Sequence, residues 1–111
     1  MNAALFIDNI PVLPAAKHYQ TLGAIPGGTH RNYDSYGHKA AKLNNKQIEI
    51  LCDPQTSGGL LVAVEKNEEK EFLEIMQQQG FNLTAIGKLH ERPQATASES
   101  ENTPQVYVSV S

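Results

Sequence analysis

The chain has 111 residues, of which 40% are hydrophobic and 19% charged, proportions typical of one small globular domain with a modest core. Its single cysteine, Cys52, excludes an internal disulfide and a zinc site built on several cysteines, and its net charge of −3 argues against a nucleic-acid partner. No window approaches the roughly 18 apolar residues of a membrane span, and no basic region opens the chain, so a cytoplasmic protein without a membrane partner is expected.

The first half of the chain predicts a strand, a helix and a long loop. An apolar run over residues 5–10 stops at a proline and indicates a strand. Pro14 suits the first position of a helix that continues over residues 15–22, and Gly23 can supply its left-handed C-cap. Residues 24–37 combine several glycines with a polar cluster and have no apolar period, so a loop is expected. A loop of this length in so small a chain favours a functional explanation.

Two apolar runs in the second half flank a glycine-rich connection. Residues 48–52, apolar except for Glu49, and the apolar residues 60–64 surround residues 53–59, so we expect two strands joined by a loop. Residues 83–89 indicate another strand. Residues 60–89 then have the length of a strand–helix–strand unit with a right-handed crossover. The fold class is therefore α/β or α+β.

A helix is expected inside that unit. Asn67 fits its N-cap, and the glutamates that follow suit the positive end of the helix dipole. Phe72, Leu73 and Met76 have the three- and four-residue spacing of a core face. Gly80 ends the helix.

The last part of the chain predicts a connector and a terminal strand. Residues 91–105 contain no Val, Ile, Leu, Met or aromatic residue, so they cannot bury enough apolar area to offset their ordering entropy. We expect a mobile loop there. The alternation over residues 106–110 predicts a strand with its valines on one face. Residues 1–111 are thus expected to form a single domain.

Gly58 and Gly59 follow Thr56 and Ser57, so this segment can present backbone N–H groups and hydroxyls to an anion. No lysine follows the glycines, and a strand rather than a helix is expected next, which excludes a P-loop. A turn or bulge between two strands is the alternative, and on local grounds it is the commoner explanation.

Arg31 lies close in sequence to Thr29 and Asn32, a set that could grip phosphate oxygens through the guanidinium fork and neutral donors. A surface arginine that braces its own loop is the alternative, and the composition leaves both open. Asp53 could bind Mg²⁺ or act in acid–base chemistry, but an aspartate before a proline more often braces a turn. A single carboxylate makes a weak metal site.

No catalytic or metal-binding residue is predicted. The histidines lack the spacing that would place two ligands on one helical face; they are His18, His30, His38 and His90. Cys52 lies in an apolar run and is better explained as a buried small hydrophobe than as a nucleophile, because nothing in the sequence lowers its pKa.

Two segments together carry a resemblance to a known family. They read Ile25-Pro26-Gly27-Gly28-Thr29-His30-Arg31-Asn32 and Leu51-Cys52-Asp53-Pro54-Gln55-Thr56-Ser57-Gly58-Gly59-Leu60-Leu61. They resemble the PGGT-x-RN loop and the DPQTSGGLL segment in the C-terminal region of the selenophosphate synthetase family, the selenide, water dikinases. The run Ile10-Pro11-Val12-Leu13-Pro14-Ala15-Ala16 is similar to the family's IPVLPGA run, with Ala15 in place of glycine. The resemblance spans essentially the whole chain.

The resemblance implies part of an ATP-dependent enzyme that makes selenophosphate from selenide and water and releases AMP and phosphate. It implies the α/β C-terminal domain shared with aminoimidazole ribonucleotide synthetase, thiamine-monophosphate kinase and a hydrogenase-maturation enzyme, cut short on its N-terminal side. The complete enzyme uses ATP and Mg²⁺. Its partners are the N-terminal ATP-binding half and a second subunit of a homodimer.

The family's catalytic Cys or selenocysteine and Lys, and its aspartate-rich Mg²⁺–ATP residues, lie in segments that match nothing here. Their roles do not transfer to Cys52, Lys17 or Asp53. The fragment alone is therefore expected to be inactive and to bind neither ATP nor Mg²⁺. The alternative is a stand-alone binding or regulatory module of the same fold without catalysis. The residues that the resemblance places toward the nucleotide cleft are Gly27, Gly28, Thr29, Arg31, Asn32, Asp53, Gln55, Thr56, Ser57, Gly58 and Gly59.

Overall fold

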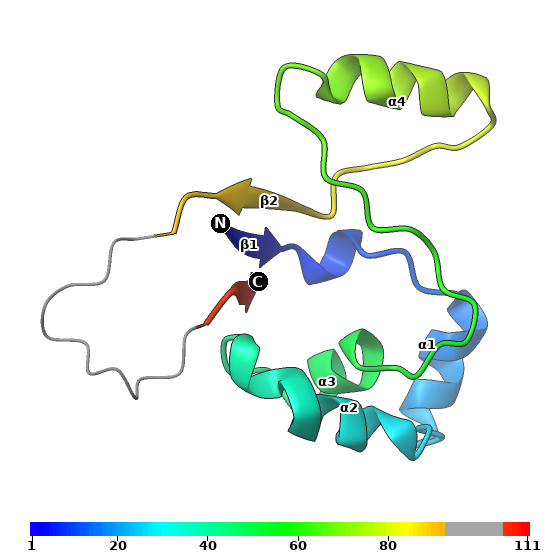
Figure 1. Cartoon of the computed structure of the whole chain (residues 1–111). Coiled ribbons are helices and arrows are strands. Elements are labelled where there is room, and N and C mark those ends of the chain that lie inside the picture. Colours follow the sequence, from blue (N-terminus) through cyan, green and yellow to red (C-terminus); the bar gives the residue numbers. More distant parts are fainter. Residues whose placement is uncertain (93–105) are drawn as a thin grey trace, which may run out of the picture.

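The computed structural model of the chain describes residues 1–92 and 106–111. The loop expected over residues 91–105 lies, apart from its first two residues, outside this part. In chain order the helices and strands are β1 (Asn2–Leu5), α1 (Pro14–Thr21), α2 (Gly28–Tyr36), α3 (Asn45–Leu51), α4 (Glu69–Gln78), β2 (Gly87–His90) and β3 (Val108–Val110) (Figure 1). The described part is thus an α+β arrangement of four α-helices and a small mixed sheet, and this confirms the predicted fold class.

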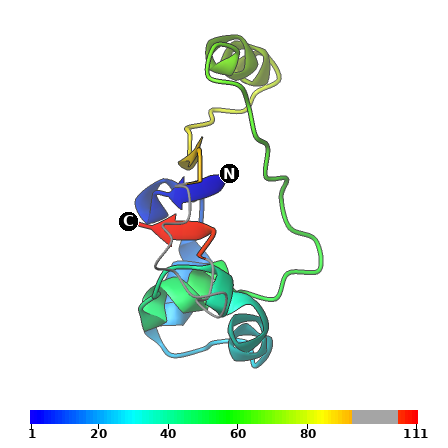
Figure 2. The same cartoon turned by 60° about the vertical axis from the view of Figure 1, so that its left-hand side comes forward.

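The helices fall into two groups around the sheet. α1, α2 and α3 gather on one side of it, whereas α4 stands apart on the other side (Figures 1 and 2). The side-chain amide of Gln20 in α1 donates to Glu49 Oε2 in α3 over 2.7 Å, which ties these two helices together. None of the described helices combines the length and the apolar character needed to cross a membrane.

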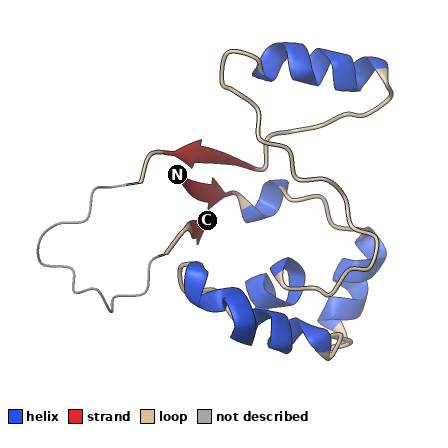
Figure 3. Ribbon diagram, in the orientation of Figure 1, coloured by secondary structure: helices blue, strands red, loops and turns tan. Residues whose placement is uncertain are grey.

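β1 is the central strand of the sheet. It pairs antiparallel with β2 and parallel with β3, so the strand order is β2-β1-β3 (Figure 3). Ala3 has Leu89 as its partner on one side and Val108 on the other. The return of the chain to the sheet as a terminal strand is confirmed, but β3 is shorter than the expected 106–110. Val108 and Val110 share its half-buried face, whereas Val106 lies outside the strand and is exposed.

The strand expected over residues 5–10 is wrong in position. The β1 ladder ends at Leu5, and Ile7–Asn9 forms a 3₁₀ helix. The side-chain amide Nδ2 of Asn9 donates to the carbonyl of Ala85 over 2.9 Å, and the backbone N–H of Ile10 donates to the carbonyl of Ile7. One long-range and one local bond thus hold the chain in a turn before the proline that was expected to end the strand.

The loop expected over residues 24–37 is also wrong, because α2 occupies most of it. Its inward face is formed by Thr29, Asn32 and Tyr33, of which only Thr29 is fully buried. Two of these residues, Thr29 and Asn32, are polar, and Tyr33 alone gives no helical period, so the sequence carries no clear apolar signal for this helix. Tertiary contacts, and not a local apolar pattern, therefore stabilise the helical conformation of these residues.

The strand expected over residues 48–52 is a helix instead, α3. Asn44 accepts from the backbone N–H of Gln47, and the Gln47 side chain accepts from the backbone N–H of Asn44, which makes a reciprocal capping box. Such a box is worth about 1 kcal/mol or more to a helix start. The pair Asn44 and Gln47 was the signal in the sequence that the strand interpretation overlooked.

The predictions for α1 and α4 are confirmed. α1 begins at Pro14, and Gly23 follows it at φ +75°. α4 is followed by Gly80 at φ +86°, the left-handed position that only glycine adopts without strain. The predicted cap is wrong by one residue, because Glu68 is the N-cap and Asn67 donates to its side chain. The expected core residues Phe72, Leu73 and Met76 are half-buried.

The strand–helix–strand unit expected over residues 60–89 is wrong. Residues 60–64 form no strand, and no backbone hydrogen bond joins them to any other described residue. Of the run 83–89 only the last three residues enter β2, whose partner β1 is antiparallel. Without a paired first strand there is no parallel crossover for α4 to complete, and two extended connections carry the chain to this helix and back (Figure 2).

The buried core of the described part is very small. It consists of Leu43 and Ile48, each 8% exposed, and the fully buried Thr29. Leu60 and Leu61 are 94% and 80% exposed. Apolar burial is the main favourable term in folding. Much apolar surface of this chain is exposed to solvent, so its burial would add to the stability of the fold.

Gly87 offers a direct test of the sheet. A Cβ at this position would meet the carbonyl oxygen of Ala4 and approach Leu5 Cδ2 to 3.1 Å, so an alanine has no room while β1 and β2 are paired. We expect Gly87→Ala to lower the free energy of unfolding by about 1 to 3 kcal/mol. Urea unfolding measures the effect, with the exposed Lys88→Ala as control. An unchanged midpoint for Gly87→Ala would contradict the pairing of β1 with β2.

Candidate functional site

The two glycine-rich segments singled out in the sequence lie side by side. The first forms the start of α2, and the second leaves the C-terminal end of α3. The side-chain amide Nδ2 of Asn32 donates to the carbonyl oxygen of Cys52 over 2.9 Å. A Cβ placed on Gly28 would come within 2.9 Å of Pro54 Cγ, so the backbone of α2 packs closely against the proline ring. Segments about 20 residues apart thus form one surface.

Most of the predicted site residues face solvent. Gly27, Arg31 and residues 54–59 are exposed, whereas Gly28, Asn32 and Asp53 are half-buried. Thr29 differs from the others because it is fully buried, and its hydroxyl has no hydrogen-bond partner among residues 1–92 and 106–111. The structure therefore brings the two segments together but does not present the Thr29 hydroxyl at the surface.

Arg31 lies at the junction of the two segments. Its Nη2 is 3.8 Å from the position of a Cβ on Gly28, the glycine that packs on Pro54. The guanidinium makes no hydrogen bond or ion pair with any residue in the described part. The Arg31 side chain therefore braces no residue of α2. The five N–H donors of its guanidinium remain available to an anion.

The glycines of the second segment do not serve a left-handed turn. In the described part only Gly23 and Gly80 have positive φ. At Gly58 a Cβ would lie 2.7 Å from Gln55 Oε1, because the glutamine side chain folds over this glycine, whereas a Cβ on Gly59 would meet nothing. The alternative of a bulge between two strands does not apply, since neither flank of residues 53–59 is a strand.

The surface is suited to an anion and not to a metal ion. Its exposed donors are the guanidinium of Arg31, the amide of Gln55 and the hydroxyls of Thr56 and Ser57, against the single carboxylate of Asp53. Among the described residues no group of three or more His, Cys, Asp or Glu side chains comes together. Magnesium is usually bound by several oxygen ligands, carboxylates among them, which this surface does not offer.

Cys52 is the C-cap of α3, not part of a strand. Partial burial raises the pKa of its thiol above the ordinary value, because desolvation disfavours the thiolate. The thiol therefore stays protonated at neutral pH and is a poor nucleophile. Its role in the structure is to offer the backbone carbonyl that Asn32 binds.

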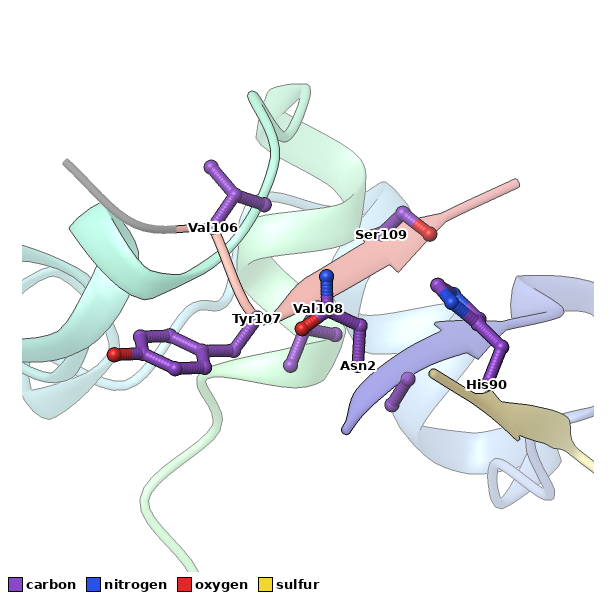
Figure 4. A pocket seen from close by; sticks show the side chains of 7 residues that line it. Asn2, His90, Val106, Tyr107, Val108 and Ser109 are labelled. Carbon is purple, nitrogen blue, oxygen red and sulfur yellow. The ribbon is translucent and has the colours of Figure 1, made fainter. Parts of the chain in front are cut away.

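Two cavities of the described part lie away from this surface. One of about 170 Å³ opens beside the sheet and is lined by Asn2, Ala3, His90, Val106, Tyr107, Val108 and Ser109 (Figure 4). A second, shallow hollow lies over residues 42–46. Neither is lined by a residue of the two glycine-rich segments. The candidate site is therefore an open surface on this chain, and another part of a protein would have to cover it to form a cleft.

Comparison with known proteins agrees with the resemblance drawn from the two segments. Residues 5–98 match the family model described as AIR synthase related protein, C-terminal domain. The chain is 58% identical over 92 residues to the selenide, water dikinase of Pseudomonas putida, which covers 83% of this chain and 27% of that enzyme. It is 51% identical over 89 residues to the selenide, water dikinase of Haemophilus influenzae, a match that covers 80% of this chain and 26% of that enzyme. It is 49% identical over 98 residues to the selenide, water dikinase of Shewanella sp. MR-4, a match that covers 88% of this chain and 28% of that enzyme.

The chain thus spans only about a quarter of the length of these relatives. The family match nevertheless runs through both glycine-rich segments, from Leu5 at the end of β1 to beyond β2. Because that match extends over most of its residues, the chain belongs to the family of C-terminal domains of AIR synthase related proteins, with selenide, water dikinases among its relatives.

Proposed function

We propose that this chain is the C-terminal part of an enzyme that forms selenophosphate from selenide, water and ATP, with release of AMP and phosphate. The observation that carries the proposal is the junction of the two glycine-rich segments, where Asn32 binds the Cys52 carbonyl and Gly28 packs on Pro54. The identity of 58% to a selenide, water dikinase supports the reaction class. This surface contacts the phosphate groups of nucleotide or product in the complete enzyme.

The residues of this surface have distinct parts in the proposal. Bound ATP supplies the phosphoryl group, and Mg²⁺ neutralises its charge. The Arg31 guanidinium binds phosphate oxygens in a bidentate manner, and Gln55, Thr56 and Ser57 add neutral donors. Gly27, Gly28, Gly58 and Gly59 let backbone N–H groups come close to an anion.

Two further residues have structural parts. Asp53 is half-buried at the turn before Pro54, and this proposal does not assign its lone carboxylate to the metal. Thr29 supports the packing of α2 from inside. This assignment leaves the metal ligands and the catalytic groups to the remainder of the enzyme.

The proposed partner is the N-terminal, ATP-binding part of the same enzyme, in a cytoplasmic homodimer. Two features support a covering partner. The relatives are almost four times as long as the matched region, and large apolar side chains such as Leu60 and Leu61 are exposed here. A partner over this face would bury apolar surface and enclose the open site.

A chimera tests the proposed function. The remainder of the Pseudomonas putida enzyme is joined to this chain in place of its own matched region, and the purified protein is given ATP, Mg²⁺ and selenide. We expect AMP and selenophosphate to form at a rate within about tenfold of the parent enzyme, since the sequences of the exchanged region are 58% identical. A folded chimera that binds ATP but forms no AMP would contradict the proposal.

A further inference from the structure

Two residues on one face of α2 hold the start of the second glycine-rich segment. Gly28 and Asn32 are four positions apart and therefore lie on the same side of the helix. Gly28 contacts the ring of Pro54, and Asn32 donates to the carbonyl of Cys52. In the described part the Asn32 bond is the one side-chain hydrogen bond that joins α2 to this segment.

The Asn32 bond lies where the chain leaves α3. Cys52 caps that helix, and the last carbonyl groups of a helix have no partner within it. By accepting from Asn32, the Cys52 carbonyl obtains a partner and its peptide plane is fixed. The direction in which the chain continues into Asp53 is therefore set by a side chain of α2.

The Gly28 contact lies two residues further along. A Cβ at this position would be 2.9 Å from Pro54 Cγ and 3.1 Å from Pro54 Cβ, and the ring cannot rotate away as a flexible side chain could. The neighbouring Gly27 has open space at the same place. The requirement for a residue without a side chain is thus specific to Gly28.

Beyond these two contacts no hydrogen bond attaches the segment to the rest of the described part. Residues 54–59 are exposed, and they make no hydrogen bond with any described residue. Its place relative to Arg31 therefore depends on how its first residues are attached to α2.

We propose that Gly28 and Asn32 are positioning residues that set residues 53–59 against the Arg31 guanidinium. This inference rests on the proposed function, in which both parts contact phosphate. Gly28 sets the distance between the segment and α2, and Asn32 sets the angle at which the segment leaves α3. In this role the Asn32 side chain does not touch the phosphate.

The first test uses the 111-residue chain and needs no activity. Backbone amide NMR shifts and hydrogen exchange are recorded for residues 55–59 in Asn32→Asp and Gly28→Ala. Asn32→Asp keeps the shape but removes the donor, and Gly28→Ala pushes on Pro54. We expect the amides of residues 55–59 to shift in both variants and their exchange to quicken at least severalfold, while Gly27→Ala leaves them unchanged.

A double variant separates positioning from general damage. Pro54→Ala removes the ring that an alanine at position 28 would strike, so Gly28→Ala with Pro54→Ala should restore the amide shifts toward those of Pro54→Ala alone. If the shifts in Asn32→Asp and Gly28→Ala stay within two residues of the substitution, or if the double variant shows no recovery, the proposal is overturned.

The chimera supplies the functional arm. Asn32→Asp should lower kcat/KM about five- to tenfold, as expected for one lost hydrogen bond. Combined with Arg31→Lys it should cost less than the product of the two single effects, because each change disturbs the same arrangement. If the loss of kcat/KM in the double variant equals the product of the two single losses, the positioning role is overturned. An inactive chimera would instead count against the proposed function, while the NMR measurements would still decide the placement of the segment.

Discussion

The isolated 111-residue chain is expected to form no AMP above a buffer control when it is incubated with ATP, Mg²⁺ and selenide. Phosphoryl transfer depends on metal-borne charge neutralisation and on precise placement of the phosphates. The described residues bring together no set of metal ligands, and the candidate surface is open to water. Both ingredients therefore have to come from the rest of an enzyme.

The measurement is a chromatographic assay of AMP over several hours, with the active chimera as positive control. Arg31→Lys and Asp53→Asn variants of the isolated chain guard against a contaminating ATPase, because a contaminant is indifferent to them. Reproducible AMP formation that either substitution abolishes would overturn the assignment of this chain as the non-catalytic part.

In the chimera, Arg31→Lys is expected to lower kcat/KM by about ten- to a hundredfold, the equivalent of roughly 1.5 to 3 kcal/mol for a charge-assisted hydrogen bond. The positive charge is kept, but an ammonium group cannot reproduce the planar fork of a guanidinium. Because Arg31 is exposed and makes no bond with a described residue, the folded protein loses no interaction. The midpoint of denaturant unfolding should therefore stay the same.

Steady-state kinetics beside an unfolding curve separates the two interpretations of Arg31 that the sequence left open. Lys17→Arg serves as the control, since it makes a matched change on exposed α1. A lowered unfolding midpoint with unchanged kcat/KM would show that Arg31 braces its own region, and the assignment of residues 27–32 to a phosphate-contacting surface would be withdrawn.

The elements that the sequence predicted correctly are those with strong local signals. α1 has a proline at its start and Gly23 at its end, and α4 has an amphipathic period closed by Gly80. α2 and α3 escaped prediction for opposite reasons. In α2 the one buried residue is Thr29 and the half-buried Asn32 is also polar, so the inner face carries no clear apolar period. In α3 the apolar residues Ile48, Ile50 and Leu51 crowd into the second half of the helix, and so short a run suited a strand.

The sheet shows the limit of local reasoning. The run at residues 60–64 has the composition of a strand, yet strand pairing needs a neighbour, and β1 and β3 lie elsewhere. Which strands pair is a property of the whole fold and of whatever covers it. The two glycine-rich segments, by contrast, could be selected from the sequence because their order and spacing resemble a family.

The contacts between those segments could not be derived from the sequence. Nothing local distinguishes Gly28 from Gly27, and only the position of Pro54 shows that one of them has to lack a side chain. Likewise Asn32 could have bound a phosphate, whereas the structure gives its amide the Cys52 carbonyl as a partner. Its predicted role as a direct ligand contact is therefore replaced by our proposal of a positioning role.

The exposed residues 60–64 bear on how long this chain persists in a cell. They are five apolar residues in a row, Leu60-Leu61-Val62-Ala63-Val64, extended and without a backbone partner in the described part. Such a stretch is a template on which other chains can add strands, and no charge or proline interrupts it before Glu65. Quality-control chaperones and proteases recognise unfolded proteins by segments of this kind. Without the covering partner proposed above, we therefore expect the chain to be degraded faster, so that its abundance follows that of the partner.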